Sequence, residues 1–569
     1  MDWHYSTRME DDLHITEKGR NTPFYGGNDG WTGYSWNKRL FPDYKKFLRE
    51  VKEKNLHVTL NLHPADGVRW WEDCYGEMAR ALGRDPATGE QIKFDIASPD
   101  FINAYFSVIH KPYERDGVDF WWIDWQQGSK SGMDGLDPLW ALNHYHTLDN
   151  AVGHGAPLIM SRYCGVGAHR YPLGFSGDTY ITWDTLQYLP KFTLTAANVG
   201  YGWWSHDIGG HYHGAKDDEL YLRHVQFGVF NPINRLHCCN AEVCTKEPWA
   251  YGNGAGEVAM QWLRLRHRLI PFLYTATYRA HAEGRPLVEP MYYEWKDKAA
   301  YNVPTQYLFG GKLIVAPIVA PAGRDGLAKR KVWLPEGEWV DIFTGAHYTA
   351  PKGGRTLTVR REYESIPVFA PAGGVLALSM DAGNGVDNPK KLEVRVWQGT
   401  DRYTLYEDNR HLQTVDGELK THFATAYCED GDTCVQTLTV EPVGDEGVAP
   451  VDRVLRLRFC DVKDAAVRVW CDGAEISAQE CVADETTVEL AVSTGHAYKI
   501  ELRYQKESEI AKLLAYARGV LVRARGRTFD KDDFWKTLRT VTTVEEYVAA
   551  VDSTDKLSAG VKGLLKEIL

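Results

Sequence analysis

The chain has 569 residues, 44% of them apolar and 25% charged, a composition typical of soluble globular proteins and a length that requires several domains. The 77 Asp and Glu outnumber the 65 Lys and Arg, for a net charge of -12, which argues against a nucleic-acid partner because phosphate binding needs a basic surface. No apolar stretch reaches ~18 residues, so we expect no membrane-spanning helix and no membrane partner.

The polar, acidic N-terminus does not look like a signal peptide. We therefore expect a cytoplasmic protein, with a signal peptide upstream of Met1 left open. The sequence does not specify an oligomeric state.

Aromatic residues and cysteines are the unusual parts of the composition, with 20 Trp, 31 Tyr and 10 Cys. The aromatic residues indicate either large cores or sugar binding, since flat rings stack on the apolar faces of sugars. Composition alone does not separate these two explanations. Cys238, Cys239 and Cys244 gather beside His237, but their spacing fits no common zinc pattern. We therefore favour buried, reduced thiols over a metal site.

The first half of the chain alternates between helix-like and strand-like segments. Helical spacing of apolar residues covers 44–51, 101–109 and 261–274, and β-rich or apolar runs cover 56–62, 118–124, 157–160 and 194–204. This order predicts a parallel sheet with helical crossovers. Asp124, Arg162, Asp207 and His237 directly follow strand-like runs or lie just past them. That position carries the active site in a (β/α)₈ TIM barrel.

From about residue 285 the pattern changes to short alternating strands with many turn signals, at 313–317, 331–334, 339–343, 356–359 and 392–398. This pattern is typical of β-sandwiches. We predict an α/β barrel over residues 1–284, a proximal β-sandwich over 285–374, a distal β-sandwich over 375–505 and a small helical tail over 506–569.

Three carboxylates are candidates for chemistry. Asp124 ends an apolar strand, Asp178 lies in the loop FSGD, and Asp207 lies in SHDIGGH. Each also has an ordinary explanation: a helix cap for Asp124, a turn residue for Asp178 and a glycine-rich loop for Asp207. Glycoside hydrolysis needs two such carboxyls, one to protonate the leaving oxygen and one to attack the anomeric carbon or activate water. The sequence does not fix the distance between them.

The histidines around Asp207, namely His206, His211 and His213, could indicate a metal site. They lack the HxxE or HExxH spacing of helix-borne metal ligands. We favour the alternative that they bind sugar hydroxyls.

Several segments together resemble glycoside hydrolase family 31, which includes α-glucosidases and α-xylosidases. The similarity runs from residue 1 to roughly 440 and rests on several motifs: MDWH at the N-terminus, RLFPD from Arg39, DFWWIDWQQ from Asp119, SRYCGVGAHRYPLGFSGD from Ser161, WSHDIGG from Trp204 and the RLH that ends at His237. Further segments, RLRHRLIPFLYT, LFGGKLIVAP and YEDN, continue the match.

The resemblance implies an enzyme that retains anomeric configuration, with Asp124 as nucleophile and Asp178 as general acid/base. It implies that four residues bind the hydroxyls of the terminal sugar and that two form apolar walls of the pocket. The hydroxyl-binding residues would be Asp2, Arg162, Asp207 and His237, and the walls would be Trp122 and Phe175. It implies no metal or organic cofactor, and an oligosaccharide or glycoside as substrate.

The sugar itself stays open. Asp2 favours an α-glucosidase, because the family uses that carboxylate for equatorial hydroxyls. Trp125, Gln126 and Gln127 replace the Met-Asn-Glu of many α-glucosidases, so α-xylosidase, α-galactosidase and α-N-acetylgalactosaminidase remain alternatives. Transglycosylation on the same scaffold and a non-catalytic sugar-binding relative also remain alternatives.

The N-terminus is the largest departure from the family pattern. Family members carry a β-sandwich and two barrel strands before the motif that matches Met1–His4. We therefore expect a barrel that is N-terminally incomplete, lacking its first two strands, as in a fragment or a chain with a late-assigned start.

Overall fold

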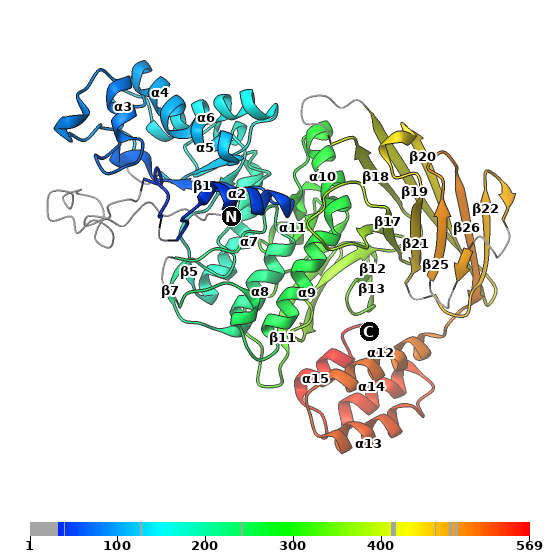
Figure 1. Ribbon diagram of the computed structural model, residues 1–569. Helices are drawn as coiled ribbons and strands as arrows, with labels where there is room; N and C mark the ends of the chain where they lie inside the picture. Colours follow the sequence, from blue (N-terminus) through cyan, green and yellow to red (C-terminus); the bar gives the residue numbers. More distant parts are fainter. Residues whose placement is uncertain are drawn as a thin grey trace. The chain divides into compact units, whose positions relative to one another are not determined.

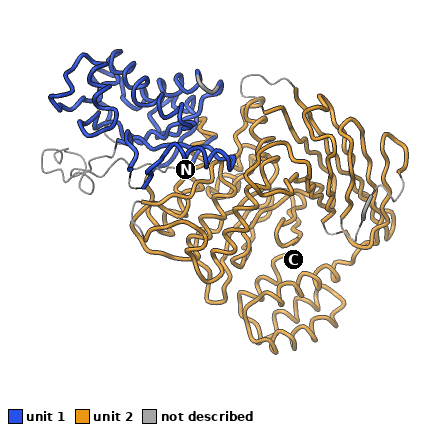
Figure 2. Tube along the Cα trace, viewed as in Figure 1, with its two compact units in different colours: residues 1–177, 203–205, 412–414 blue, residues 178–202, 206–411, 415–569 orange. Residues whose placement is uncertain are grey.

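A computed structural model describes residues 32–38, 40–125, 128–239, 243–410, 417–460, 462–476, 481–483 and 487–569. The chain divides into two compact units, shown in different colours in Figure 2. The first unit consists of residues 1–177, 203–205 and 412–414, and the second of residues 178–202, 206–411 and 415–569.

The first unit is built on a five-stranded parallel sheet in the order β1-β2-β3-β4-β6. Its strands are β1 (Thr59–Leu62), β2 (Phe120–Ile123), β3 (Ile159–Ser161), β4 (Gly174–Phe175) and β6 (Trp204–Ser205). All four pairings are parallel. The carboxyl ends of these strands therefore lie along one edge of the sheet, which is where α/β barrels carry functional side chains.

Helices connect these strands, as the alternating pattern predicts. They are α2 (Tyr44–Glu53), α3 (Tyr75–Ala81), α4 (Pro99–Ala104), the π-helical turn η4 (Tyr105–His110), α5 (Lys111–Asp116) and α6 (Pro138–His154). Side chains cap several of them: Asp43 accepts from the backbone N–H of Lys46, and Asp137 accepts from Leu139 and Trp140. Such caps satisfy backbone donors that the first helical turn leaves without partners.

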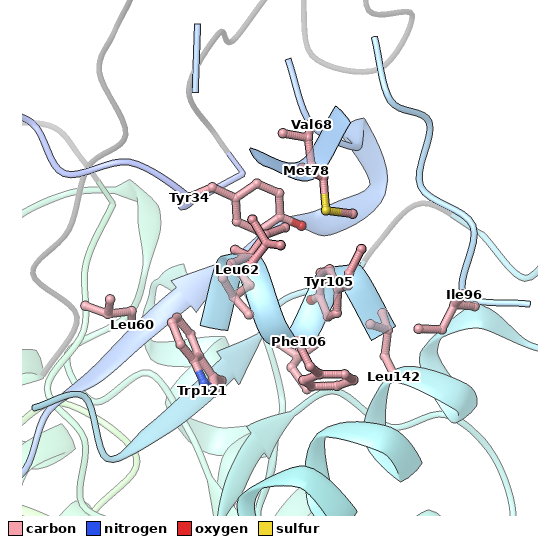
Figure 3. Packing of buried hydrophobic residues seen from close by; sticks show 14 of the residues in the cluster. Tyr34, Leu60, Leu62, Val68, Met78, Ile96, Tyr105, Phe106, Trp121 and Leu142 are labelled. Carbon is pink, nitrogen blue, oxygen red and sulfur yellow. The ribbon is translucent and has the colours of Figure 1, made fainter. Parts of the chain in front are cut away.

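One hydrophobic core joins the sheet and helices of this unit, and Figure 3 shows part of it. Leu60 and Leu62 of β1 and Trp121 of β2 are almost fully buried beside Tyr105 of η4. Three of the four residues in β2 are buried, which explains why residues 118–124 form one apolar run in the sequence.

One helix of the second unit overlaps a segment where we predicted a strand. The run 194–204 is not strand-like throughout, because α7 (Trp183–Asn198) extends into it and only Trp204–Ser205 form a strand. Leu186, Leu189, Thr193 and Ala197 are buried at helical spacing. The prediction failed because the Thr-rich, apolar end of this helix also has high β propensity.

A second correction concerns the helix predicted over 261–274. The structure has two helices there, α9 (Ala255–Arg268) and α10 (Ile270–Glu283), with Leu269 between them. Pro271 lacks a backbone N–H and its ring crowds the preceding turn, so it stands at the start of a new helix. The helix α8 (Asp218–Val229) precedes this pair.

Antiparallel strands form most of the rest of this unit (Figure 1). A six-stranded sheet has the order β13-β12-β15-β10-β9-β8, beside the two-stranded sheet β11-β14. These strands are β8 (Val288–Pro290), β9 (Tyr307–Phe309), β10 (Leu313–Val315), β11 (Ala328–Leu334), β12 (Gly337–Asp341), β13 (His347–Ala350), β14 (Arg355–Arg361) and β15 (Val368–Pro371).

Two larger sheets follow, in the orders β16-β17-β21-β25-β24 and β18-β19-β20-β26-β22-β23. Leu392 and Leu455 of one sheet and Leu405 and Phe423 of the other line the same interior space, as expected for a sandwich. The strands are β16 (Val375–Ser379), β17 (Lys391–Val396), β18 (Arg402–Asp408), β19 (Glu418–Asp430), β20 (Thr433–Gly444), β21 (Arg453–Phe459), β22 (Ala466–Cys471), β23 (Ala474–Glu475), β24 (Cys481–Ala483), β25 (Thr487–Val492) and β26 (Tyr498–Gln505).

The C-terminal segment is helical, as its apolar spacing predicts. It comprises α12 (Glu509–Arg523), α13 (Thr528–Leu538), α14 (Val544–Ser553) and α15 (Ala559–Leu565), drawn in orange to red in Figure 1. These helices share a core of their own. In the part of the chain that the structure describes, no helix is both long and apolar enough to cross a membrane.

A buried ionic cluster ties this helical segment to the preceding sheets. The guanidinium of Arg361 on β14 donates to Asp341 on β12 at 2.6 Å and to Glu567 at 2.6 Å. The three side chains are 0% exposed. The hydroxyl of Tyr348 also donates to the carboxylate of Glu567, at 2.6 Å. Glu567 thus supplies part of the charge balance for an arginine in the neighbouring sheet.

Candidate functional site

Asp124 is the central residue of the candidate site in the first unit. It directly follows β2, and its backbone N–H donates to the carbonyl oxygen of Leu62 at 2.9 Å, which extends the pairing with β1 by one residue. The side chain is 9% exposed. A nearly buried carboxylate is costly unless other groups compensate its charge.

Two side chains supply that compensation. Arg162 donates from Nε to Oδ1 of Asp124 in a very short contact, and the Nε2 of His63 lies 3.4 Å from Oδ2. Burial on its own raises the pKa of Asp124, but His63 and Arg162 outweigh it and hold the pKa well below its usual range. Asp124 is therefore ionised at neutral pH.

The sequence analysis missed His63. It follows the last residue of β1 just as Asp124 follows the last residue of β2, and its backbone N–H donates to the carbonyl oxygen of Thr32 at 3.2 Å. A polar residue at the end of a neighbouring parallel strand is a signal that could have found it.

Arg162 is held in place by its surroundings in the first unit. Its guanidinium lies over the ring of Phe175, 4.9 Å from the ring centroid. A Cβ on Gly177 would lie 1.8 Å from Nη1 of Arg162, and Gly177 has a φ of +79°. Glycine is thus required there twice, for its backbone conformation and for the space that the arginine occupies.

Trp122 and Phe175, the two predicted apolar walls, contact each other. Their rings are 5.5 Å apart at 88°, and both belong to one small buried cluster with Met160. Of the predicted site residues, the structure thus brings Trp122, Asp124, Arg162 and Phe175 together in the first unit.

The second unit holds the other described candidates. Asp178, Asp207 and His211 each offer a ligand or hydrogen-bonding atom, and these atoms lie within 4.8 Å of one another. Arg235 donates to Oδ1 of Asp207 at 2.5 Å. Burial raises the pKa of Asp207, and the charge of Asp178 adds to the rise, whereas Arg235 and His211 oppose it.

Two extended segments position these groups. Ile208, next to Asp207, forms a parallel bridge with Leu236, next to His237. The ring of His237 stacks on that of His211, with centroids 4.8 Å apart and planes at 20°. Asp207 and His237 are therefore placed by one backbone pairing, with His211 as the link between them.

The hydrogen-bonding capacity of this cluster is not used up by protein atoms. Oδ2 of Asp207 and Nδ1 of His211 are buried and have no protein partner among the described residues. Sugar hydroxyls both donate and accept hydrogen bonds, so they suit a carboxylate and an imidazole side by side. The same atom types could also bind a metal, which is the alternative that the sequence raised.

The other histidines and the cysteines take separate positions. His206 is fully buried beside Thr193, and burial lowers its pKa to about 3. Cys238, Cys239 and Cys244 are free thiols, and among the described residues they belong to no cluster of possible metal ligands. Burial raises the pKa of Cys238 to about 11, so this thiol is protonated at neutral pH.

Asp2, Gln126 and Gln127 lie outside the described residues.

Comparison with protein families matches two regions. Residues 2–276 match the glycosyl hydrolases family 31 TIM-barrel domain, and residues 284–376 match the glycosyl hydrolase family 31 C-terminal domain. Together with the parallel sheet and the antiparallel sheets, these matches confirm the predicted fold class, an α/β TIM-barrel domain followed by β-sandwich domains.

Curated relatives point the same way. An alpha-xylosidase of Saccharolobus solfataricus is 24% identical over 425 residues, covering 68% of this chain and 54% of that protein. Alpha-glucosidase 2 of Bacillus thermoamyloliquefaciens is 24% identical, with 67% and 52% covered. Neutral alpha-glucosidase AB of Homo sapiens is 31% identical over 461 residues, with 73% and 48% covered. The chain spans about half the length of the curated relatives it matches.

Solved structures share the fold. A dextranase of Flavobacterium johnsoniae complexed with glucose has a TM-score of 0.67 at 23% identity, covering 84% of this chain and 66% of that one. An alpha-xylosidase of Xanthomonas citri has a TM-score of 0.63 at 19% identity, with 84% and 54% covered.

Proposed function

Because the chain belongs to glycosyl hydrolase family 31, we propose that it is a retaining, exo-acting α-glycosidase. It would remove terminal, non-reducing, α-linked sugars from an oligosaccharide or glycoside through a covalent glycosyl-enzyme intermediate. The observation that carries the proposal is the buried Asp124 at the end of β2, which has a hydrogen-bond donor against each carboxylate oxygen.

In this mechanism Asp124 is the nucleophile. Its ionised carboxylate attacks the anomeric carbon and forms an ester while the leaving oxygen is protonated. The low pKa that His63 and Arg162 maintain supports this role, because the carboxylate needs no deprotonation before attack. The same low basicity makes Asp124 a good leaving group when water later breaks the ester.

Asp178 is the proposed general acid/base. It would protonate the glycosidic oxygen in the first step and take a proton from water in the second. Its neighbours Asp207 and His211 support a sugar-binding environment, because their buried Oδ2 and Nδ1 atoms suit hydroxyl groups. We propose that Asp2, Arg162, Asp207 and His237 bind hydroxyls of the terminal sugar and that Trp122 and Phe175 form its apolar walls.

Glucose is the sugar we favour, and relatives named alpha-glucosidase support it. Xylose is the second candidate, since other relatives are named alpha-xylosidase. The segment that begins at Trp125 departs from the common α-glucosidase pattern, so galactose and N-acetylgalactosamine belong in any substrate panel. Product analysis with an added sugar acceptor would detect transglycosylation.

The direct test is an assay against aryl α-glycosides of glucose, xylose, galactose and N-acetylgalactosamine, with the anomer released followed by NMR. We expect cleavage of one α-glycoside with the α-anomer formed first. Initial release of the β-anomer would refute the retaining mechanism. Binding of a sugar without cleavage of any substrate would favour the non-catalytic alternative.

Two variants test the roles. Asp124→Asn should abolish turnover, whereas Asp178→Asn should slow alkyl glycosides far more than aryl glycosides, whose leaving groups need little acid help. Asp85→Asn, at an exposed cap of a short 3₁₀ helix, is the matched control and should keep full activity. Equal losses on both substrate classes would remove Asp178 from the acid/base role.

A further inference from the structure

A second cluster of metal-ligating side chains lies far from these carboxylates in the sequence. Cys471, Asp472 and His496 each offer one ligand atom, and these atoms lie within 4.8 Å of one another. Cys471 is the last residue of β22, Asp472 lies in the turn that follows it, and His496 lies in the turn before β26, all in the sheet that begins with β18. Cys471 and His496 are 25 positions apart, so no short sequence motif predicts the cluster.

The backbone fixes both turns. Asp472 and Gly473 have φ values of +48° and +82°, as required at the two central positions of a tight hairpin turn. The N–H of Asp472 donates to the carbonyl oxygen of Ala497 at 2.9 Å, and the N–H of Ala497 donates back to Oδ1 of Asp472 at 2.9 Å. Cys471 pairs with Tyr498 in the ladder. The three side chains are therefore held near one another before any ligand binds.

The donor set has a specific chemical preference. A thiolate, an imidazole and a carboxylate together suit Zn²⁺, whereas Mg²⁺ and Ca²⁺ prefer oxygen ligands alone. Zinc bonds of about 2.0–2.3 Å to these atoms would place ligands roughly 3.3–3.6 Å apart in a tetrahedral site. The Nδ1 of His496 is now 2.5 Å from Oδ2 of Asp472, so this pair would open by about 1 Å around the ion.

The surroundings favour a cation and allow it to enter. The side chains of His496 and Asp472 are 49% and 53% exposed, so they can adjust and leave a fourth position to water. Glu446 brings a further carboxylate against this loop, because a Cβ on Gly495 would lie 2.4 Å from its Oε1.

We propose that Cys471, Asp472 and His496 form a zinc site that joins two turns of the distal sandwich. The alternative is that Asp472 and His496 only brace these turns by their hydrogen bond. The two differ in whether the thiol takes part, because turn bracing does not need Cys471. This site is independent of the proposed glycosidase activity.

Cobalt titration of the full chain tests the thiol directly, since Co²⁺ replaces Zn²⁺ and gives a thiolate charge-transfer band in the near ultraviolet. We expect one Co²⁺ per chain with this band, and Zn²⁺ should displace it. Cys471→Ser should abolish the band and weaken Zn²⁺ binding at least tenfold, and His496→Ala should also weaken binding. Cys428→Ser, at an exposed thiol on β19, is the matched control and should bind like the unmodified chain.

Alkylation of the unmodified chain, mapped by mass spectrometry, gives a second readout that needs no variant. Zn²⁺ should protect Cys471 from alkylation and leave Cys428 reactive. A charge-transfer band that persists in Cys471→Ser, or equal alkylation of Cys471 with and without Zn²⁺, would overturn the proposal. Metal binding without a thiolate band would also overturn the proposal, because Cys471 would then not be a ligand.

Discussion

Replacement of Arg361 by methionine tests the buried ionic cluster that joins the C-terminal helices to the sheets. Methionine keeps most of the unbranched stem of the side chain but removes the guanidinium, so the carboxylates of Asp341 and Glu567 would remain buried without their shared cation. Both side chains are 0% exposed. Removal of one partner from a buried ion pair costs about 3–5 kcal/mol. The equilibrium constant between the folded and unfolded forms of this region should therefore fall by roughly two to four powers of ten.

Urea unfolding at pH 7, followed by tryptophan fluorescence, measures this cost, because Trp333 and Trp339 lie in the core of the same sheets. Limited proteolysis should also release the helical segment from Arg361→Met more rapidly. The matched control is Arg402→Met, at an exposed arginine on β18, and it should change stability by less than about 0.5 kcal/mol. An Arg361→Met chain within about 1 kcal/mol of the unmodified protein would refute the claim that the cluster stabilises this region.

Three further predictions concern the candidate site. His63→Leu removes a hydrogen-bond donor from Asp124, so the pKa of Asp124 should rise and the acid limb of the pH profile of kcat/KM should move up by roughly one pH unit. His63→Asn keeps a donor and should move this limb less. A limb that does not move in either variant would show that His63 does not hold down the pKa of Asp124. Gly177→Ala should displace Arg162 and lower kcat/KM about 100-fold. Gly128 also has a positive φ (+84°), but no atom lies within 4 Å of a Cβ placed there, so Gly128→Ala should lower kcat/KM much less. Similar losses in the two variants would mean that backbone strain alone is responsible. Because burial raises the pKa of Asp207, its ionised form lowers the stability of the folded chain above that pKa, and this loss disappears as the pH falls. The melting temperature of Asp207→Asn minus that of the unmodified chain should therefore be larger at pH 8 than at pH 4. The opposite trend would contradict the raised pKa.

The sequence predicted the parts of the site that depend on local pattern. Asp124 and Arg162 were predicted as site residues because each follows an apolar strand, and such positions meet at one edge of a parallel sheet. His63 occupies an equivalent position but precedes Pro-Ala-Asp-Gly, which reads as an ordinary turn. Its importance comes from contact with a residue 61 positions away, and no local pattern carries that information.

The absence of long-range information in local sequence patterns also explains where the predictions of the fold were wrong or incomplete. The end of α7 was predicted as a strand because Thr and Leu side chains suit both states, and only burial on one helical face decides between them. The pairing of Arg361 with Glu567 could not be predicted, since charged residues are expected on the surface unless a partner is known. Long-range contacts decided each of these cases.

The ionic cluster also has a consequence for biosynthesis. Arg361 and Glu567 are 206 residues apart, and a ribosome adding about 5–20 residues per second needs about 10–40 s to cover that interval. Throughout it, Asp341 and Arg361 have been made, but the second acid that balances the arginine has not. The nascent sheet would expose an unfinished face for that time, and a molecular chaperone that covers this face would favour correct folding.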